Sequence, residues 1–182
     1  MNIFVLHLNP IIAAQMHCDR HVVKMIIESA QLLYCCILVH GVMYHDPDII
    51  ETAPLTSSGT HGYRVTHRNH PCAIWVAKSV ANYEWLITMA KELCRQYTIR
   101  YGKTHATEQH IDWLSYLCPN IPDVPLTPFS IVMPDVCKCL SIDQDIDKSL
   151  NQYDPVKSYR NYYIMEKKWA KWEKTEVPYW WT

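Results

Sequence analysis

The sequence predicts an all-α fold, a compact helical bundle with a short extended segment at residues 2–8 and a proline-rich strap on its surface. Apolar residues recur at helical spacing over long stretches, and residues that start or stop helices bracket those stretches. Only four glycines occur among the 182 residues, which argues against many tight hairpins. An apolar share of 49% at this length predicts one globular domain over residues 1–182.

The first expected helix begins after Asn9, a capping residue that is followed by Pro10 at the first helical position. Its apolar pattern continues to about His40, and Gly41 stands where helices usually end in a left-handed residue. Asp19 is able to cap a second helix, so the pattern also allows a break at that point.

Residues 42–63 hold two prolines, two glycines and a Thr-Ser-Ser run, and they predict a loop. The next expected helix begins near Asn69 or His70, with Pro71 in its first turn. Apolar residues at helical spacing carry it to Gly102.

A shorter helix is expected over residues 108–117, just before the strap. The strap is residues 119–134, which hold five prolines in sixteen residues and cannot form regular structure. A final helix begins at the capping pair Asp154 and Pro155, and we expect it to reach Trp172.

The net charge of −1 does not by itself predict a nucleic-acid partner, but the charges are unevenly distributed. Residues 143–147 are acidic, whereas lysines and arginine crowd the C-terminal quarter, so a basic face is compatible with the even balance. No run of eighteen uncharged apolar residues occurs, so we expect no membrane-spanning helix and no membrane partner. The N-terminus lacks the features of a secretory signal, and we therefore expect the eight cysteines to be free thiols, mostly in the core.

A polar stripe runs along the expected helix between residues 17 and 31. At 100° per residue, His17, His21, Lys24, Glu28 and Gln31 fall within an arc about 80° wide. The rest of the circumference is almost entirely apolar, which predicts a helix that passes through the core. The stripe is either the solvent-exposed edge of that helix or the lining of a site where neighbouring groups shift each other's pKa values.

A metal site is an alternative use of the same residues. His17 and His21 stand four apart on one helical face, a spacing that can share a zinc ion, and His67, His70 and Cys72 could supply further ligands. The cysteine spacing matches no closed structural zinc site, so we expect no bound metal and no cofactor.

Three stretches of the chain carry a resemblance to a known family. The first is the helix with His21 and Glu28 seven apart. The second is "GYRVTHRNHPCAIW" at residues 62–75, and the third is "SYRNYYIMEKK" at residues 158–168. Together they cover about a third of the chain, and they resemble the pyrimidine-dimer DNA glycosylases of the phage endonuclease V type, as a divergent member from large phages or giant viruses.

The resemblance implies an all-helical enzyme that acts on damaged double-stranded DNA inside the host cell of a virus or phage. In such enzymes the N-terminal α-amine attacks the sugar C1′ of the damaged nucleotide, releases the base, and forms a Schiff base that leads to strand cleavage. A reference α-amino pKa of about 7.7–8.0 leaves part of an amine unprotonated at neutral pH. Glu28 would assist as the acid/base or electrostatic group, and His21 would contact the sugar-phosphate.

This sequence departs from the phage pattern at its second residue. The phage enzymes lose their methionine and expose a small residue, whereas Asn2 is bulky, so we expect Met1 to stay. The nucleophile is then either the Met1 amine or Lys24, if the apolar helix lowers the pKa of that lysine.

The resemblance also implies DNA-binding residues, and these include His17, Arg68 and His70. In the C-terminal stretch, residues that would grip phosphate or stack on bases are Tyr159, Arg160, Tyr162, Tyr163 and Lys167. The same aromatic spacing also fits a helix-packing face, with the basic residues in solvent.

The sequence and this resemblance therefore predict a DNA repair glycosylase that excises damaged pyrimidines, and whether strand cleavage follows base release is left open. One alternative is a zinc-dependent or other nucleotide-modifying enzyme that uses the His and Cys residues. The other is a non-catalytic viral module that binds DNA or a protein. The lesion and the oligomeric state are left open.

Overall fold

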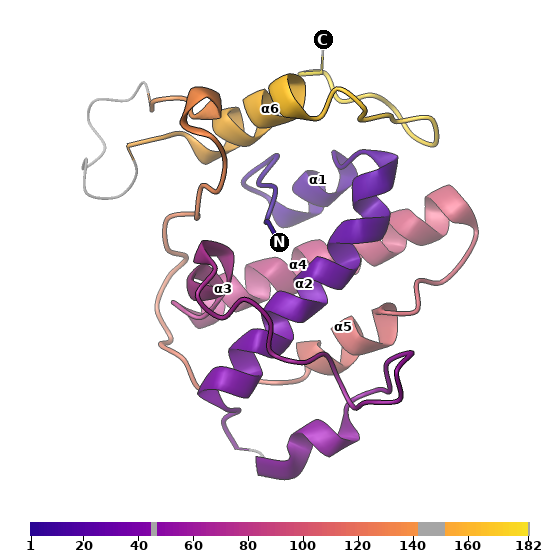
Figure 1. Cartoon of the computed structure of the whole chain (residues 1–182), viewed down its shortest axis with the longest axis vertical. Coiled ribbons are helices and arrows are strands. Elements are labelled where there is room, and N and C mark those ends of the chain that lie inside the picture. Colours follow the sequence, from indigo (N-terminus) through magenta and orange to yellow (C-terminus); the bar gives the residue numbers. More distant parts are fainter. Residues whose placement is uncertain (45–46, 142–151, 182) are drawn as a thin grey trace.

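The computed structural model describes residues 1–44, 47–141 and 152–181, and it confirms the helical bundle (Figure 1). The acidic residues 143–147 lie outside the described residues. Within the described ranges the regular structure is helical, without β-strands. The helices are α1 (Pro10–Gln15), α2 (Asp19–His40), η1 (Pro47–Thr52), α3 (Pro71–Val76), α4 (Val80–Tyr101), α5 (Glu108–Ser115), η2 (Asp135–Cys137) and α6 (Pro155–Glu166).

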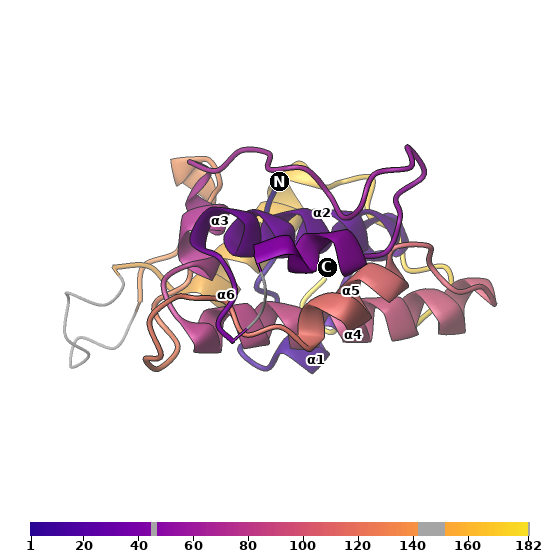
Figure 2. The same cartoon turned by 90° about the horizontal axis from the view of Figure 1, so that it is seen from below.

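The helices form two layers with α6 across one end (Figures 1 and 2). α2 and α3 lie in one layer, and α4 packs against both of them from the other. α1 also packs on α4, and α5 contacts α2 and α4. The N-terminus lies beside α2 and α3, on the face seen in Figure 1.

Capping residues set several of the predicted helix ends. The Asn9 side chain accepts hydrogen bonds from the N–H groups of Ile11 and Ile12, and Asp154 accepts one from Lys157. Gly102 is left-handed with φ of +64°, whereas Gly41 has φ of +79° with an extended ψ. Both glycines end a helix with a positive φ that a side chain rarely adopts.

Three helices are shorter than predicted, and the smallest difference is at α5, which ends at Ser115 rather than at residue 117. The helix expected from residue 70 to 102 is broken between α3 and α4, because the Ser79 hydroxyl caps a new helix at Asn82. The Asn82 side chain also donates to the Trp75 carbonyl, which accepts the Lys78 N–H as well at the end of α3. The last helix ends at Glu166 rather than at Trp172, which packs in the core from the irregular tail that follows.

The core agrees with the sequence prediction. The N-terminal segment is buried from Ile3 to Leu6, without forming a strand. All eight cysteines are free thiols, and six of them are buried. The strap at residues 119–134 is irregular, and Asn82 holds it through hydrogen bonds with Thr127.

α2 is long and apolar enough to cross a membrane by length and composition, and 61% of its most apolar window is buried in the bundle.

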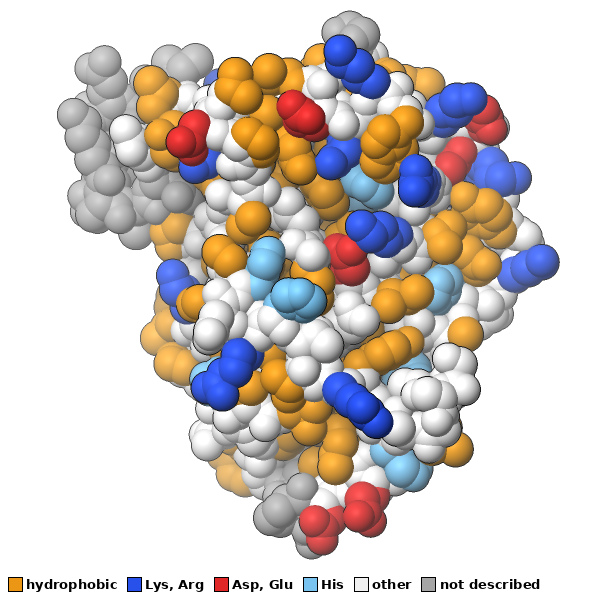
Figure 3. Space-filling model, in the orientation of Figure 1, with side chains coloured by type: hydrophobic (Ala, Val, Ile, Leu, Met, Phe, Trp, Pro, Cys, Tyr) orange, Lys and Arg blue, Asp and Glu red, His pale blue; other side chains and the backbone are white. Residues whose placement is uncertain are grey.

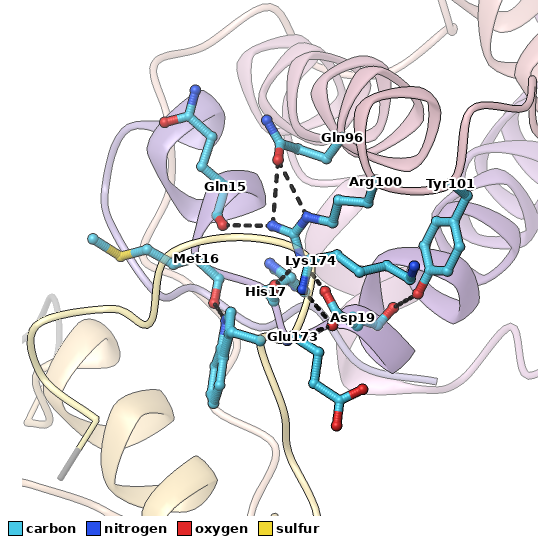
Figure 4. A network of polar contacts seen from close by, with 10 residues as sticks. Gln15, Met16, His17, Asp19, Gln96, Arg100, Tyr101, Glu173 and Lys174 are labelled. Carbon is cyan, nitrogen blue, oxygen red and sulfur yellow. Dashed lines mark hydrogen bonds and ion pairs between the residues drawn. The ribbon is translucent and has the colours of Figure 1, made fainter.

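A buried arginine joins the turn between α1 and α2 to α4 (Figure 4). The Arg100 side chain is 0% exposed, and it donates to the carbonyls of Gln15 and His17 at 2.9 and 2.8 Å. It also contacts the Gln96 side chain and forms an ion pair with Asp19 at 3.1 Å. All of its partners are oxygen acceptors, so the buried charge is satisfied.

Asp19 extends the same network to the C-terminal tail. Its second carboxylate oxygen accepts hydrogen bonds from the backbone N–H groups of Glu173 and Lys174 (Figure 4). Its own N–H donates to the Lys171 carbonyl, and its carbonyl accepts from the Tyr101 hydroxyl. The predicted break at Asp19 is confirmed, but Cys18 is the N-cap and Asp19 is the first helical residue.

We predict that Arg100→Met lowers the free energy of unfolding by about 3–5 kcal/mol, because it leaves the carboxylate of Asp19 without its buried cation. Arg95→Met is the matched control, since Arg95 is 57% exposed in its ion pair with Glu92 and its loss should change the free energy of unfolding much less. Urea unfolding at neutral pH measures both variants. Equal midpoints would contradict a structural role for the Arg100 network.

Candidate functional site

A hollow of about 450 Å³ opens beside the N-terminal half of α2, and we call it the N-terminal hollow. Four segments enclose it: the first residues of the chain, α2, the strap and the end of α6. The lining residues are Met1, Asn2, Phe4, Lys24, Glu28, Val132, Met133, Tyr162 and Lys167. This volume is within the range of small-molecule and nucleotide sites.

Asn2 anchors the start of the chain to all the other walls of the hollow. Its N–H donates to the Glu28 carboxylate at 3.1 Å, and its side-chain amide donates to the Val132 carbonyl at 2.8 Å. Its side-chain oxygen accepts from the Tyr159 hydroxyl at 2.8 Å and lies 3.7 Å from the Cys72 thiol. Because these bonds hold Asn2 from several directions, Met1 is held at the hollow.

Glu28 is the carboxylate of the hollow, and its side chain is 12% exposed. One oxygen accepts the Asn2 N–H, and the other lies 3.0 Å from the Lys24 ammonium. The Lys24 side chain is 62% exposed, so it lies at the mouth of the hollow rather than among apolar groups. On the opposite wall, the Lys167 ammonium donates to the Tyr162 hydroxyl and lies 4.4 Å from the centre of that ring.

The two histidines of the polar stripe lie deeper than Lys24 and Glu28. His17 and His21 are 0% and 3% exposed, and Phe4 stacks on the His21 ring. His17 is hydrogen-bonded to the Ala13 carbonyl, and His21 to the Tyr163 hydroxyl. His21 therefore supports the floor under Phe4 and does not line the hollow.

Burial keeps both histidines neutral. It lowers the pKa of His17 to about 4; the hydrogen bond to the Ala13 carbonyl opposes this effect, and the Arg100 charge adds to it. Burial also lowers the pKa of His21 to about 2, and positive charge on His17, Lys167 and Lys24 adds to this effect. Both histidines are therefore unprotonated on one ring nitrogen and uncharged at neutral pH.

His70 lies near the N-terminal hollow and caps α3. Its ring accepts the Cys72 N–H at 3.2 Å. Burial lowers the pKa of His70, the positive charges of the N-terminal amine and His67 lower it further, and the negative charge of Glu28 opposes them. His70 is connected to the N-terminal segment through Cys72, whose thiol lies 3.7 Å from the Asn2 side-chain oxygen.

The C-terminal aromatic residues are divided between core and surface. Tyr159 and Tyr163 are both 0% exposed, so their rings pack in the core as the helix-packing alternative predicts. Arg160 donates to the Leu6 carbonyl and to the Tyr179 hydroxyl, which ties the tail to the N-terminal segment. The rings of Tyr159 and Tyr163 and the imidazole of His17 are thus covered by protein, whereas Arg160 is half-buried.

The predicted catalytic and DNA-binding residues are therefore only partly brought together. Met1, Lys24, Glu28 and Lys167 line one hollow, and His21 lies beneath it. Arg68 is exposed on the segment before α3 and lines a different hollow. Sequence reasoning missed the wall that the strap supplies, because nothing in its proline pattern indicates which helix it covers.

The histidines and cysteines do not gather into a metal centre. Across the described residues, no group of three or more His, Cys, Asp or Glu side chains has an arrangement that could hold a metal ion. The zinc alternative therefore has no geometric support in this part of the chain.

Comparisons with known proteins give no functional assignment for this chain. No protein family model, no curated protein and no solved structure matches this chain.

We predict that stability falls as the pH falls below 6.5. The unfolded chain binds a proton at each histidine with the ordinary pKa of 6.5, whereas folded His17 and His21 stay neutral down to about 4 and about 2. Below pH 6.5 the unfolded state therefore binds more protons, and each histidine lowers the free energy of unfolding by about 1.4 kcal/mol per pH unit until its folded pKa is reached.

Urea unfolding between pH 7 and pH 5 measures this slope. His21→Gln should reduce the slope, since it removes one of the sites at which the unfolded chain binds more protons than the folded chain. The rest of the slope should remain, because burial also lowers the pKa values of His17, His70, His105 and His110. His40→Gln is the control, because His40 is exposed and should leave the slope unchanged. A wild-type stability that is equal at pH 7 and pH 5 would show that the two histidines are not buried in the folded protein.

Proposed function

We propose that this protein is a DNA glycosylase that excises damaged pyrimidines with an amine nucleophile and then cleaves the strand. One observation carries the proposal: the N-terminal hollow combines Met1, the amine of Lys24 and the carboxylate of Glu28. An amine and a carboxylate in one recess are the groups that glycosidic bond cleavage through a Schiff base requires.

Each group has a defined role in the proposed reaction. The amine attacks the sugar C1′ while the base leaves with the electrons of the glycosidic bond, and opening of the sugar ring forms the Schiff base. Positive charge develops on the sugar in this step, and the Glu28 carboxylate stabilises it electrostatically. Elimination of the 3′ phosphate then requires removal of a proton from the sugar, for which Glu28 is within the same recess.

The surroundings of the hollow favour a polyanionic, base-containing substrate. Lys167 and Lys24 stand on opposite sides of it, and the Arg20 guanidinium lies 4.8 Å from the centre of the Trp169 ring. Trp169 is 41% exposed and also meets the edge of His21. Exposed aromatic and basic groups beside a recess are suited to a nucleotide that has been flipped out of the duplex.

Two amines remain candidates for the nucleophile. The Met1 amine belongs to the residue that Asn2 holds at the hollow, whereas Lys24 is exposed and ion-paired with Glu28. The geometry favours Met1, because an amine engaged by a carboxylate at the mouth must leave that pair before it attacks.

Reductive trapping tests the proposal directly. Borohydride added to the protein with a duplex that contains a thymine dimer, or an abasic site, should produce a covalent protein–DNA complex. Mass mapping of the trapped peptide then identifies Met1 or Lys24 as the attached residue. DNA binding that depends strongly on salt, without trapping or cleavage on either duplex, would instead indicate the non-catalytic binding module.

We predict that Glu28→Gln slows base release by about 10²–10⁴-fold, the usual contribution of an acid/base group. Glutamine keeps the shape of the side chain and its acceptor for the Asn2 N–H, so the fold should persist. Glu84→Gln is the matched control on α4, where Glu84 is exposed in the opposite layer. Equal rates of base release from the two variants in single-turnover assays would remove Glu28 from the mechanism.

A further inference from the structure

A second hollow of about 270 Å³ lies between the C-terminal half of α2 and α3, and we call it the α3 hollow. Its floor is apolar and includes Cys35, Val39 and Ala73. Its other lining residues include Arg68 and Lys78, whose side chains are exposed. The proposed reaction does not use this hollow.

The two hollows open along one face of α2. At 100° per residue, Lys24, Glu28, Cys35 and Val39 all fall within an arc of about 60°. Lys24 and Glu28 line the N-terminal hollow, whereas Cys35 and Val39 line the α3 hollow. Eleven residues separate Lys24 from Cys35, which places the hollows about 16 Å apart along the helix axis.

The segment that leads into α3 connects the two hollows. His70 accepts the N–H of Cys72, whose thiol lies 3.7 Å from the side-chain oxygen of Asn2 at the N-terminal hollow. Two residues earlier, Arg68 lines the other hollow, where its positive charge acts on the buried Cys35 thiol against the burial that raises the pKa of that group. A ligand that follows α2 from one hollow to the other would therefore pass along residues 68–70.

The charge of the α3 hollow is positive. Its lining includes Arg68, Lys78 and the exposed His40 but no acidic side chain. Within the described ranges, neither Arg68 nor Lys78 forms an ion pair. In Figure 3, basic side chains and histidines surround an acidic side chain near the middle of this face. Unpaired cations at the edge of an apolar floor complement a phosphodiester with its sugar.

We infer that the α3 hollow binds the phosphate backbone of the DNA strand that enters the N-terminal hollow, with Arg68 and Lys78 holding the phosphates. This assignment rests on the proposed function for the identity of the reacting nucleotide. At 3.4 Å of rise per nucleotide, the 16 Å between the hollows corresponds to about five nucleotides of flanking duplex. The α3 hollow therefore meets the DNA on one side of the lesion only.

The double variant Arg68→Gln/Lys78→Gln tests the inference through the salt dependence of binding. The slope of log K against log salt, measured with a lesion-containing duplex, should become shallower by about 1.8, because each phosphate that a cation neutralises adds about 0.9 to the slope. Lys91→Gln is the control, because Lys91 is exposed on α4 in the opposite layer and should leave the slope unchanged. Thermal unfolding checks that both variants fold.

Duplex length supplies a second readout. Shortening the flank from ten to three base pairs should weaken wild-type binding on one side of the lesion and not on the other. The double variant should not show this asymmetry, because its α3 hollow no longer holds the distant phosphates. A double variant with the wild-type slope and the wild-type asymmetry would overturn the inference.

The two proposals fail in different ways. Trapping by the wild-type protein together with an unchanged slope in the double variant would overturn the α3 hollow as a DNA-binding site and leave the glycosylase intact. A shallower slope without any trapping would support DNA binding at the α3 hollow and overturn the glycosylase.

Discussion

The side chain of Asn2 is the constraint on which the N-terminal hollow depends. The side-chain amide of Asn2 donates to the Val132 carbonyl of the strap, and the side-chain oxygen accepts from the Tyr159 hydroxyl of α6. The backbone N–H of Asn2 donates to the Glu28 carboxylate of α2. Segments that are far apart in the chain therefore converge on one residue. Removal of the side-chain amide would leave the Val132 carbonyl without this donor, and an unsatisfied group costs more than the bond itself contributes, whereas the Tyr159 hydroxyl keeps its bond to the Ser130 carbonyl.

The polar groups under the hollow form a rigid support. His17 and His21 are neutral and hydrogen-bonded in the core. Arg100 of α4 donates a hydrogen bond to the His17 carbonyl in the turn between α1 and α2. Nε2 of His17 has no hydrogen-bond partner among the described residues, whereas the contacts of Arg100 are all made to oxygen acceptors. Buried polar groups that are satisfied in this way restrict a core to one arrangement more strictly than apolar contacts do. The lysine and the glutamate that line the hollow are thus carried by a helix whose start is fixed on two sides.

Local rules predicted much of the fold, because caps, prolines and helical spacing act between near neighbours. They located Asn9, Asp154 and Gly102 correctly, and the 100° rotation placed Lys24 and Glu28 together on one face. They did not predict the break before Ser79, whose cap competes with an otherwise continuous helical pattern.

The same local rules did not predict how deeply each side chain is buried in the bundle. His21 shares its stripe with Lys24, yet Phe4 and Tyr163 cover it from segments that a helical wheel does not contain. The aromatic residues of α6 likewise fitted both DNA contact and helix packing, and the structure buries Tyr159 and Tyr163 in the core. The role of Asn2 in the hollow has no local signal, since its partners in the other walls lie between 26 and 157 residues away.

The position of Met1 has a practical consequence for how the protein is produced. Because Met1 lines the hollow and Asn2 is held by its neighbours, an affinity tag placed before Met1 would have to leave through the recess and would obstruct it. Its peptide bond would also convert the terminal amine into an amide, which is not a nucleophile. Recombinant material intended for assays should therefore be purified by a tag at the opposite end of the chain.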